Sequence, residues 1–327
     1  MKYKLFGLRT GLYASELALG AANFGTLKGY GANPGESQKI LAAYKEAGGN
    51  FIDVSDVYQF GQAEEIVGKF LEKQRTNFII CTKYTRSSEL TPSISNTGNN
   101  RKSMKQAVES SLRRLKTDYI DFYMPHFDDG ITPLDEIARG LEDLVKDGKV
   151  LYSGLTNFPA WKVAAIATSV KLSALQIEYN LLARTAERDL LPMADEFGLG
   201  TMMYSPLAGG VLTGKYRTGK LGRINFVADA VYNEDKKTKT ILDTLLSISK
   251  DINASPGQVA FAWVLSKGAF PLIGARKLEH FEHSLKAASI NLTEEQISLL
   301  DKSSSISLGY PHDLLATVRR ADIKLRS

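Results

Sequence analysis

Four residues in the first half of the chain carry the side chains that reduction of a carbonyl group requires. Asp53 lies in an apolar run, Tyr58 follows it by five residues, and Lys83 and His126 come after two later apolar runs. A tyrosine, whose ordinary pKa is about 10, can donate a proton near neutral pH if a neighbouring positive charge stabilises the phenolate. Lys83 could supply this charge, and Asp53 could be the counter-ion of a buried Lys83. Each residue alone has an ordinary role in turns, packing or solvation, but together they predict a carbonyl reduction site.

The elements that would position these residues follow a regular alternation of short apolar runs and amphipathic segments, which predicts βα units around a parallel sheet. Strands are expected at residues 17–20, 51–54, 78–82, 119–123, 152–156, 174–177, 201–204 and 270–273. Helices are expected at residues 35–47, 63–73, 101–115, 133–146, 160–168, 185–197 and 255–266. Gly48, Gly148 and Gly198 follow three of these helices as C-caps do, and Ser255-Pro256 is typical of a helix start.

Eight such units without a break in composition favour an α/β fold of the closed (β/α)8 TIM-barrel type over an open doubly wound sheet. One domain is expected over residues 1–327, with an N-terminal β-hairpin near residues 5–15. Extra C-terminal helices are expected at residues 277–288 and 293–303, the second opened by a capping box from Thr293 to Gln296. The long stretches 85–100 and 217–235 should build a pocket, and the polar tail 309–327 should lie over the barrel mouth.

Composition argues against several other classes of protein. Apolar residues make up 43% and charged residues 24%, and no apolar run is long enough for a membrane helix. Residues 1–12 lack the apolar core of a signal peptide, so a cytoplasmic location is expected. The net charge of +5 comes from scattered basic residues, so no nucleic-acid partner is expected. Cys81 is the only cysteine, which rules out an internal disulfide.

Motifs for other kinds of chemistry are absent from the sequence. Neither G-x-G-x-x-G after the first strand nor G-x-x-x-x-G-K-[ST] occurs, so any dinucleotide is held without a Rossmann or P-loop cradle. No G-x-S-x-G elbow of a serine hydrolase is present. His280 and His283 share a helical face without a third ligand, so no metal site is expected.

Motifs spread over almost the whole chain resemble those of the aldo-keto reductase superfamily, and in particular its bacterial, potassium-channel β-subunit-like branch. Near the second strand this family has the form G-x-N-x-x-D-T-A-x-x-Y-G-x-x-E. The residues that fit it with small shifts are Gly48 or Gly49, Asn50, Asp53, Tyr58, Gly61 and Glu64. Three later segments are also similar to family elements: residues 111–121, residues 147–158 with Gly154-Leu155-Thr156-Asn157-Phe158, and Tyr204-Ser205-Pro206-Leu207 with Gly214-Lys215-Tyr216.

The resemblance implies a role for each matching position. Tyr58 would be the general acid, Lys83 and Asp53 its tuning pair, and His126 the donor that orients the substrate. Thr156, Asn157 and Gln176 would hold the nicotinamide carboxamide, and Tyr204 would stack on the ring. Ser205, Leu207 and Lys215 would meet the pyrophosphate, while Gly274, Arg276, His280 and Ser284 would line the region of the adenosine phosphate. The expected aromatic residues of the substrate pocket are Phe24, Tyr84, Phe127 and Phe158.

Departures from the family pattern bear on the cofactor rather than on catalysis. Gly274 and His280 stand where many members have Lys and Arg for the 2′-phosphate, and Ser284 replaces an Asn near the adenine. Arg276 could restore the lost charge, so NADP(H) is favoured and NAD is the alternative cofactor. Val54, Ser55 and Ala63 replace the usual Thr, Ala and Ser of the signature. None of these changes removes a proton donor.

The resemblance implies an NADP-dependent reductase that takes an aldehyde or ketone to the alcohol, with Tyr58 as the general acid. One alternative is an NAD-dependent sugar or polyol dehydrogenase, and another is a redox-sensing binding module like the channel β subunits. The expected partner is a small carbonyl or alcohol substrate, and a monomer is expected because it is the commonest state in the family.

Overall fold

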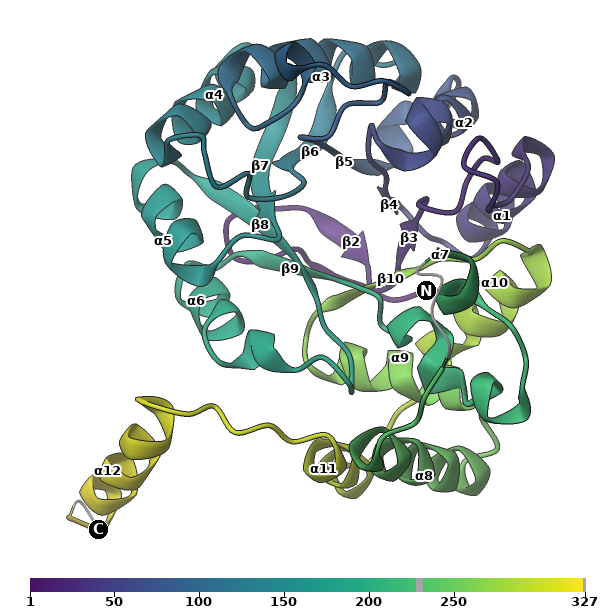
Figure 1. Cartoon of the computed structure of the whole chain (residues 1–327), viewed down its shortest axis with the longest axis vertical. Helices are drawn as coiled ribbons and strands as arrows, with labels where there is room; N and C mark the ends of the chain where they lie inside the picture. Colours follow the sequence, from purple (N-terminus) through teal and green to yellow (C-terminus); the bar gives the residue numbers. More distant parts are fainter. Residues whose placement is uncertain (228–231, 326–327) are drawn as a thin grey trace.

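A computed structural model describes residues 1–227 and 232–325 and contains a closed barrel of eight parallel strands. The strands lie in the order β10-β3-β4-β5-β6-β7-β8-β9, and helices surround them (Figure 1). Their bounds are β3 Ala18–Gly20, β4 Phe51–Asp53, β5 Ile79–Tyr84, β6 Ile120–Pro125, β7 Val150–Thr156, β8 Leu172–Glu178, β9 Gly200–Tyr204 and β10 Phe270–Ile273. All eight predicted strands are confirmed, with ends that differ by at most two residues, and the fold is the predicted (β/α)8 TIM barrel.

The helices of the barrel wall also follow the predicted pattern, except that the helix at residues 236–251 is additional to the expected ranges. They are α1 Pro34–Glu46, α2 Gln62–Leu71, α3 Arg101–Leu115, α4 Leu134–Lys146, α5 Ala160–Ser169, α6 Leu190–Glu196, α8 Lys236–Asp251, α9 Pro256–Ser266, α10 Leu278–Leu285 and α11 Glu294–Ser303. Ser255 caps α9 through a capping box with Gln258, and Thr293 caps α11 in the same way with Gln296. These local signals place the helix starts because they satisfy backbone N–H groups that have no partner within the helix.

The N-terminal hairpin closes one end of the barrel. Strands β1 Tyr3–Leu5 and β2 Tyr13–Ser15 pair antiparallel, and the chain then buries Phe6 completely. The Phe6 ring lies 5.3 Å from Phe51, 4.8 Å from Phe122 and 5.0 Å from Phe270. Phe51 and Phe270 are the first residues of β4 and β10. The amino-terminal end of the barrel is therefore filled, and the carboxyl ends of the strands remain for a site.

The helix predicted at residues 185–197 is wrong in its first half. A separate 3₁₀ turn, Thr185–Glu187, precedes α6, which begins only at Leu190. Pro192 explains the break, because its ring would clash with the carbonyl group four residues earlier, at Arg188, in a continuous helix.

The long stretch 217–235 is also not wholly irregular. It contains the short helix α7 Arg223–Val227, while residues 228–231 lie outside the described part of the chain.

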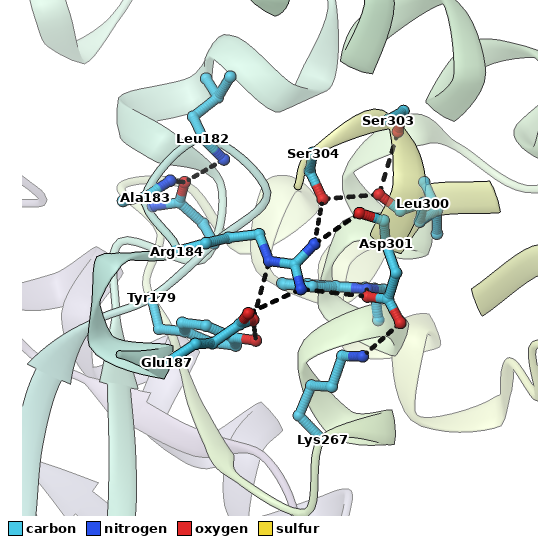
Figure 2. A network of polar contacts seen from close by, with 12 residues as sticks. Tyr179, Leu182, Ala183, Arg184, Glu187, Lys267, Leu300, Asp301, Ser303 and Ser304 are labelled. Carbon is cyan, nitrogen blue, oxygen red and sulfur yellow. Dashed lines mark hydrogen bonds and ion pairs between the residues drawn. The ribbon is translucent and has the colours of Figure 1, made fainter. Parts of the chain in front are cut away.

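The buried side chain of Arg184 connects the barrel to helix α11 (Figure 2). The guanidinium of Arg184 donates to both carboxylate oxygens of Glu187 at 2.8 Å. It also donates to the carbonyl oxygen of Asp301 and to Ser304 Oγ, both at 2.8 Å. Lys267, the residue directly after α9, donates to the Asp301 carboxylate at 2.8 Å. This network joins segments that are more than a hundred residues apart in sequence.

The prediction that the tail 309–327 lies over the barrel mouth is wrong. The tail forms α12 His312–Leu325, which leads away from the barrel (Figure 1). Its start is held at the rim, where Arg188 donates to the Tyr310 carbonyl oxygen and His312 contacts Asp189. In the two described ranges, no helix combines the length and apolar character that crossing a membrane requires.

Candidate active site

The four predicted catalytic side chains meet at the carboxyl ends of β4, β5 and β6. The Nζ atom of Lys83 lies 2.6 Å from Asp53 Oδ1 and donates to the Val54 carbonyl oxygen at 2.8 Å. Lys83 is fully buried, and Asp53 is 1% exposed. Gln176, from β8 across the barrel, donates to the same Asp53 oxygen at 2.7 Å. A buried ammonium is stable here because the carboxylate compensates its charge, and Asp53 holds the pKa of Lys83 above its ordinary value against the opposing effect of burial.

Tyr58 lies directly beside this ion pair. It opens a 3₁₀ turn, Tyr58–Gly61, that follows β4, and the Lys83 ammonium is 5.3 Å from the centre of its ring. Burial raises the pKa of Tyr58, while the positive charge of Lys83 lowers it, and the net direction is upward. Lys83 therefore lowers the pKa of Tyr58 as expected, but burial raises this pKa by more. The phenol remains protonated at neutral pH, as a proton donor must be.

His126 packs against the tyrosine and is neutral. Its ring meets the Tyr58 ring edge-to-face with centres 5.7 Å apart, and Phe127 stacks on it at 4.4 Å. Burial, reinforced by the positive charges of Lys83, Arg86 and Lys28, lowers the pKa of His126 to about 2. The imidazole can therefore donate one hydrogen bond and accept another, but it does not carry a charge.

Ser55 is a member of the site that sequence reasoning noted only as a departure from the family signature. Its Oγ atom lies 3.0 Å from Nδ1 of His126, so the other ring nitrogen, Nε2, is left for a substrate. The residue after it, Asp56, is 2% exposed. Burial and the nearby Glu64 raise the pKa of Asp56 to about 7, although Arg114 opposes the shift. The position of Ser55, two residues after Asp53 and just past the end of the same strand, could have indicated from the sequence that this residue belongs to the site.

A cavity of about 880 Å³ opens above these residues and contains most of the predicted cofactor-binding side chains. Asp53, Tyr58 and His126 line it at one end. The predicted cofactor residues on its walls are Asn157, Gln176, Tyr204, Ser205, Leu207, Lys215, Gly274, Arg276, His280 and Ser284. Thr156 is the exception, and its expected contact is corrected: the side chain is fully buried, and its hydroxyl lies 3.2 Å from the Met124 sulfur rather than on the cavity wall.

Beside the catalytic residues, the cavity wall is held by a chain of hydrogen bonds. The Tyr204 hydroxyl donates to Asn157 Oδ1 at 2.8 Å, and Asn157 Nδ2 donates to the His126 carbonyl oxygen at 3.0 Å. Asn157 and Ser205 both adopt left-handed backbone conformations, with φ of 57° and 53°. The strained positions cluster where the loops after β7 and β9 turn towards the cavity, as is common at binding sites.

The opposite end of the cavity is strongly basic. Lys215 and Arg276 line it as predicted, and Lys220 and Arg223 join them from the long stretch after β9. Within the described ranges none of the four forms an ion pair with a carboxylate. Burial and the charge of Arg276 lower the pKa of Lys215. Four cations that pair with no carboxylate of the described residues make this end suited to an anionic group such as a phosphate.

The remaining predicted pocket residues separate into one that lines the cavity and three that do not. Phe127 is on the wall. Phe24, Tyr84 and Phe158 are buried in the barrel packing, with at most 2% of each exposed. The stretch 85–100 also contributes nothing to this wall, whereas 217–235 contributes Lys220, Leu221 and Arg223.

The comparison with known proteins gives one family. Residues 16–305 match the model of the aldo/keto reductase family. The chain is 32% identical to an aryl-alcohol dehydrogenase [NADP(+)] of Phanerodontia chrysosporium, over 92% of this chain and 86% of that protein. It is 31% identical to norsolorinic acid reductase of Aspergillus flavus, over 96% of this chain and 84% of that protein. It is 32% identical to aldo-keto reductase ausK of Aspergillus calidoustus, with 96% and 85% covered.

These relatives are fungal proteins, so the narrower resemblance to a bacterial, potassium-channel β-subunit-like branch is not confirmed. The family itself rests on the match over most of the barrel together with the meeting of Asp53, Tyr58, Lys83 and His126 at one strand end. The chain belongs to the aldo/keto reductase family.

Proposed function

We propose that this protein is an NADP(H)-dependent oxidoreductase that reduces an aldehyde or ketone to the alcohol, with Tyr58 as the general acid. The observation that carries the proposal is the fully buried Lys83, which is paired with Asp53 at 2.6 Å and lies 5.3 Å from the Tyr58 ring. A fixed ammonium at this place stabilises the phenolate that proton donation leaves behind. Bound NADPH would supply the hydride.

The other polar groups would orient the substrate and direct the proton. The Ser55 hydroxyl, 3.0 Å from Nδ1 of His126, occupies that nitrogen and leaves Nε2 for the substrate. The tautomer with its proton on Nε2 would donate to a carbonyl oxygen. A neutral imidazole suits this role because it polarises the carbonyl group without competing with Tyr58 as an acid. In the direction of oxidation, the same Tyr58 would receive the proton of the alcohol.

The shape and charge of the cavity fit a phosphorylated dinucleotide. Its neutral end, with Asn157, Gln176 and Tyr204, suits a nicotinamide, and its basic end suits phosphates. Lys215, Lys220, Arg223 and Arg276 at that end provide more positive charge than a pyrophosphate alone would need, which favours NADP(H) over NAD. The name of one relative, an aryl-alcohol dehydrogenase [NADP(+)], supports both this cofactor and an aromatic substrate.

Two measurements test the proposal. Tyr58→Phe should keep the affinity for NADPH and lower the rate of aromatic aldehyde reduction by about 10²- to 10⁴-fold, the usual contribution of a general acid. An unchanged rate would contradict the role of Tyr58.

Fluorescence titration of the wild-type protein with NADPH and NADH should give at least about tenfold tighter binding of NADPH, or about 1.4 kcal/mol. Equal or tighter binding of NADH would favour the NAD-dependent sugar or polyol dehydrogenase. Binding of either cofactor without turnover of any carbonyl substrate would favour the redox-sensing module.

A further inference from the structure

Two cations lie beside the catalytic end of the cavity without lining its wall, and neither forms an ion pair within the described ranges. Lys28 lies in the loop between β3 and α1, and Arg86 lies in the loop between β5 and α3. Both loops leave the carboxyl ends of barrel strands, where the active sites of TIM barrels are built. Both side chains belong to exposed residues, so they can meet a ligand that enters from solvent.

Lys28 is held against the turn that carries Tyr58. Its ammonium donates to the Val57 carbonyl oxygen at 2.7 Å and lies 4.7 Å over the Phe60 ring. Its backbone N–H donates to the Gln59 side chain at 2.7 Å. The charge is therefore fixed beside the residues that directly flank the proton donor.

Arg86 is placed beside the other catalytic ring. Its guanidinium carbon lies 5.9 Å from the centre of the Phe127 ring, which stacks on His126 at 4.4 Å. Arg86 is close enough to Lys28 for its charge, together with burial, to lower the pKa of Lys28. The charges of both residues also contribute to the lowered pKa of His126.

The carboxylates in the neighbouring loops do not neutralise these cations. Asp128 pairs with Lys162 at 2.7 Å, and Asp129 accepts from Asn99 and Thr132. The charge of Asp56 raises the pKa of Lys28, but Asp56 is buried and forms no ion pair with the Lys28 ammonium. In the part of the chain that the structure describes, neither Lys28 nor Arg86 forms an ion pair.

We propose that Lys28 and Arg86 recognise an anionic group of the substrate, so that the site prefers carbonyl compounds that carry a carboxylate distant from the carbonyl group. The proposal rests on the carbonyl reduction proposed above and adds the class of substrate. Two like charges that form no ion pair with a described carboxylate repel each other. A bound carboxylate would relieve this repulsion while accepting charge-assisted hydrogen bonds. Phe127 on the cavity wall would pack against an aromatic ring that joins the two groups.

The experiment compares 4-carboxybenzaldehyde with 4-methylbenzaldehyde, which have similar shapes and differ in charge. The wild-type protein should show a kcat/KM at least about tenfold higher for the carboxylate, or about 1.4 kcal/mol. In the double variant Lys28→Met/Arg86→Met this ratio should fall towards one, mainly through KM for the carboxylate. About 1 M salt should also reduce the wild-type ratio, because it shortens the screening length to about 3 Å.

A matched control removes two exposed cations from the outer helices, Lys102→Met on α3 and Arg139→Met on α4, and should keep the wild-type ratio. A wild-type ratio near one, or a high ratio that survives in Lys28→Met/Arg86→Met, would overturn the proposal. Turnover of neither aldehyde would instead count against carbonyl reduction. In that case calorimetric titration of the two aldehydes into the protein decides the anion preference, and equal affinities would refute it.

Discussion

The buried pair of Lys83 and Asp53 makes a sharp prediction about stability. Lys83→Met would remove an ammonium that lies 2.6 Å from the carboxylate and leave Asp53, 1% exposed, with the bond from Gln176 but without a cationic partner. Removing one partner of a buried ion pair costs about 3–5 kcal/mol, mostly because the other charge stays buried and uncompensated. Since whole proteins are stable by only about 5–15 kcal/mol, this loss is large.

A second substitution tests the cause of that loss. Asp53→Asn in the Lys83→Met background replaces the uncompensated charge by a neutral amide, so the double variant should regain at least about 2 kcal/mol relative to Lys83→Met. The assay is urea unfolding followed by tryptophan fluorescence and circular dichroism, with the free energy taken from the midpoint and slope. A double variant as unstable as Lys83→Met would refute the reasoning.

The same variants separate structure from chemistry. The double variant should remain at least about tenfold slower than wild type even where it is fully folded, because Tyr58 has lost the ammonium that stabilises its phenolate. Recovery of wild-type turnover together with stability would mean that Lys83 is needed only for folding.

Three further predictions concern other parts of the barrel. The pKa of the Asp56 carboxyl rises from 3.8 to about 7 on folding. Between these two pH values the folded protein binds more protons at Asp56 than the unfolded protein does. The stability that Asp56 contributes is therefore lost as pH rises through this window. Asp56→Asn should therefore be more stable than wild type by about 2–4 kcal/mol at about pH 8, with a smaller difference at about pH 5, in urea unfolding at both pH values. Arg184→Met should cost about 3–5 kcal/mol and make α11 sensitive to limited proteolysis, because the buried bonds to Glu187, Asp301 and Ser304 are lost. Gly68→Ala should cost about 1–3 kcal/mol in thermal unfolding, because a Cβ atom there would lie 2.2 Å from the Arg114 carbonyl oxygen.

Each of these has a matched control within the chain. Asp118→Asn changes an exposed carboxylate and should show no comparable pH-dependent gain. Arg188→Met removes an arginine whose side chain is 49% exposed, and Gly11→Ala adds a Cβ with no atom within 4 Å; both should change stability by at most about 0.5 kcal/mol. If a control changed stability as much as its partner, burial and packing would not be the cause.

The barrel and the catalytic residues were accessible from sequence because their signals are local. The eight strand runs, the helix start at Ser255-Pro256 and the capping box at Thr293 depend on residues only a few positions apart. The sequence placed them within two residues of their observed positions. The break in the helix at 185–197 was missed although its cause, Pro192, was visible. The α12 helix was missed because a polar tail carries no signal of where it packs.

The details of the site depended on contacts between distant segments. Ser55 meets His126 from 71 positions away, and Gln176 meets Asp53 from 123 positions away. Lys220 and Arg223 reach the basic end of the cavity from a stretch with no sequence motif, while Thr156, which matches one, is buried outside it.

The sequence alone determined the fold, the family and the four reactive side chains, because periodicity and short motifs are written in neighbouring residues. Only the tertiary structure decided the balance of effects on each group. The pKa of Tyr58 rises although Lys83 lowers it, and His126 is neutral, because burial and through-space charge depend on which distant segments the barrel brings together.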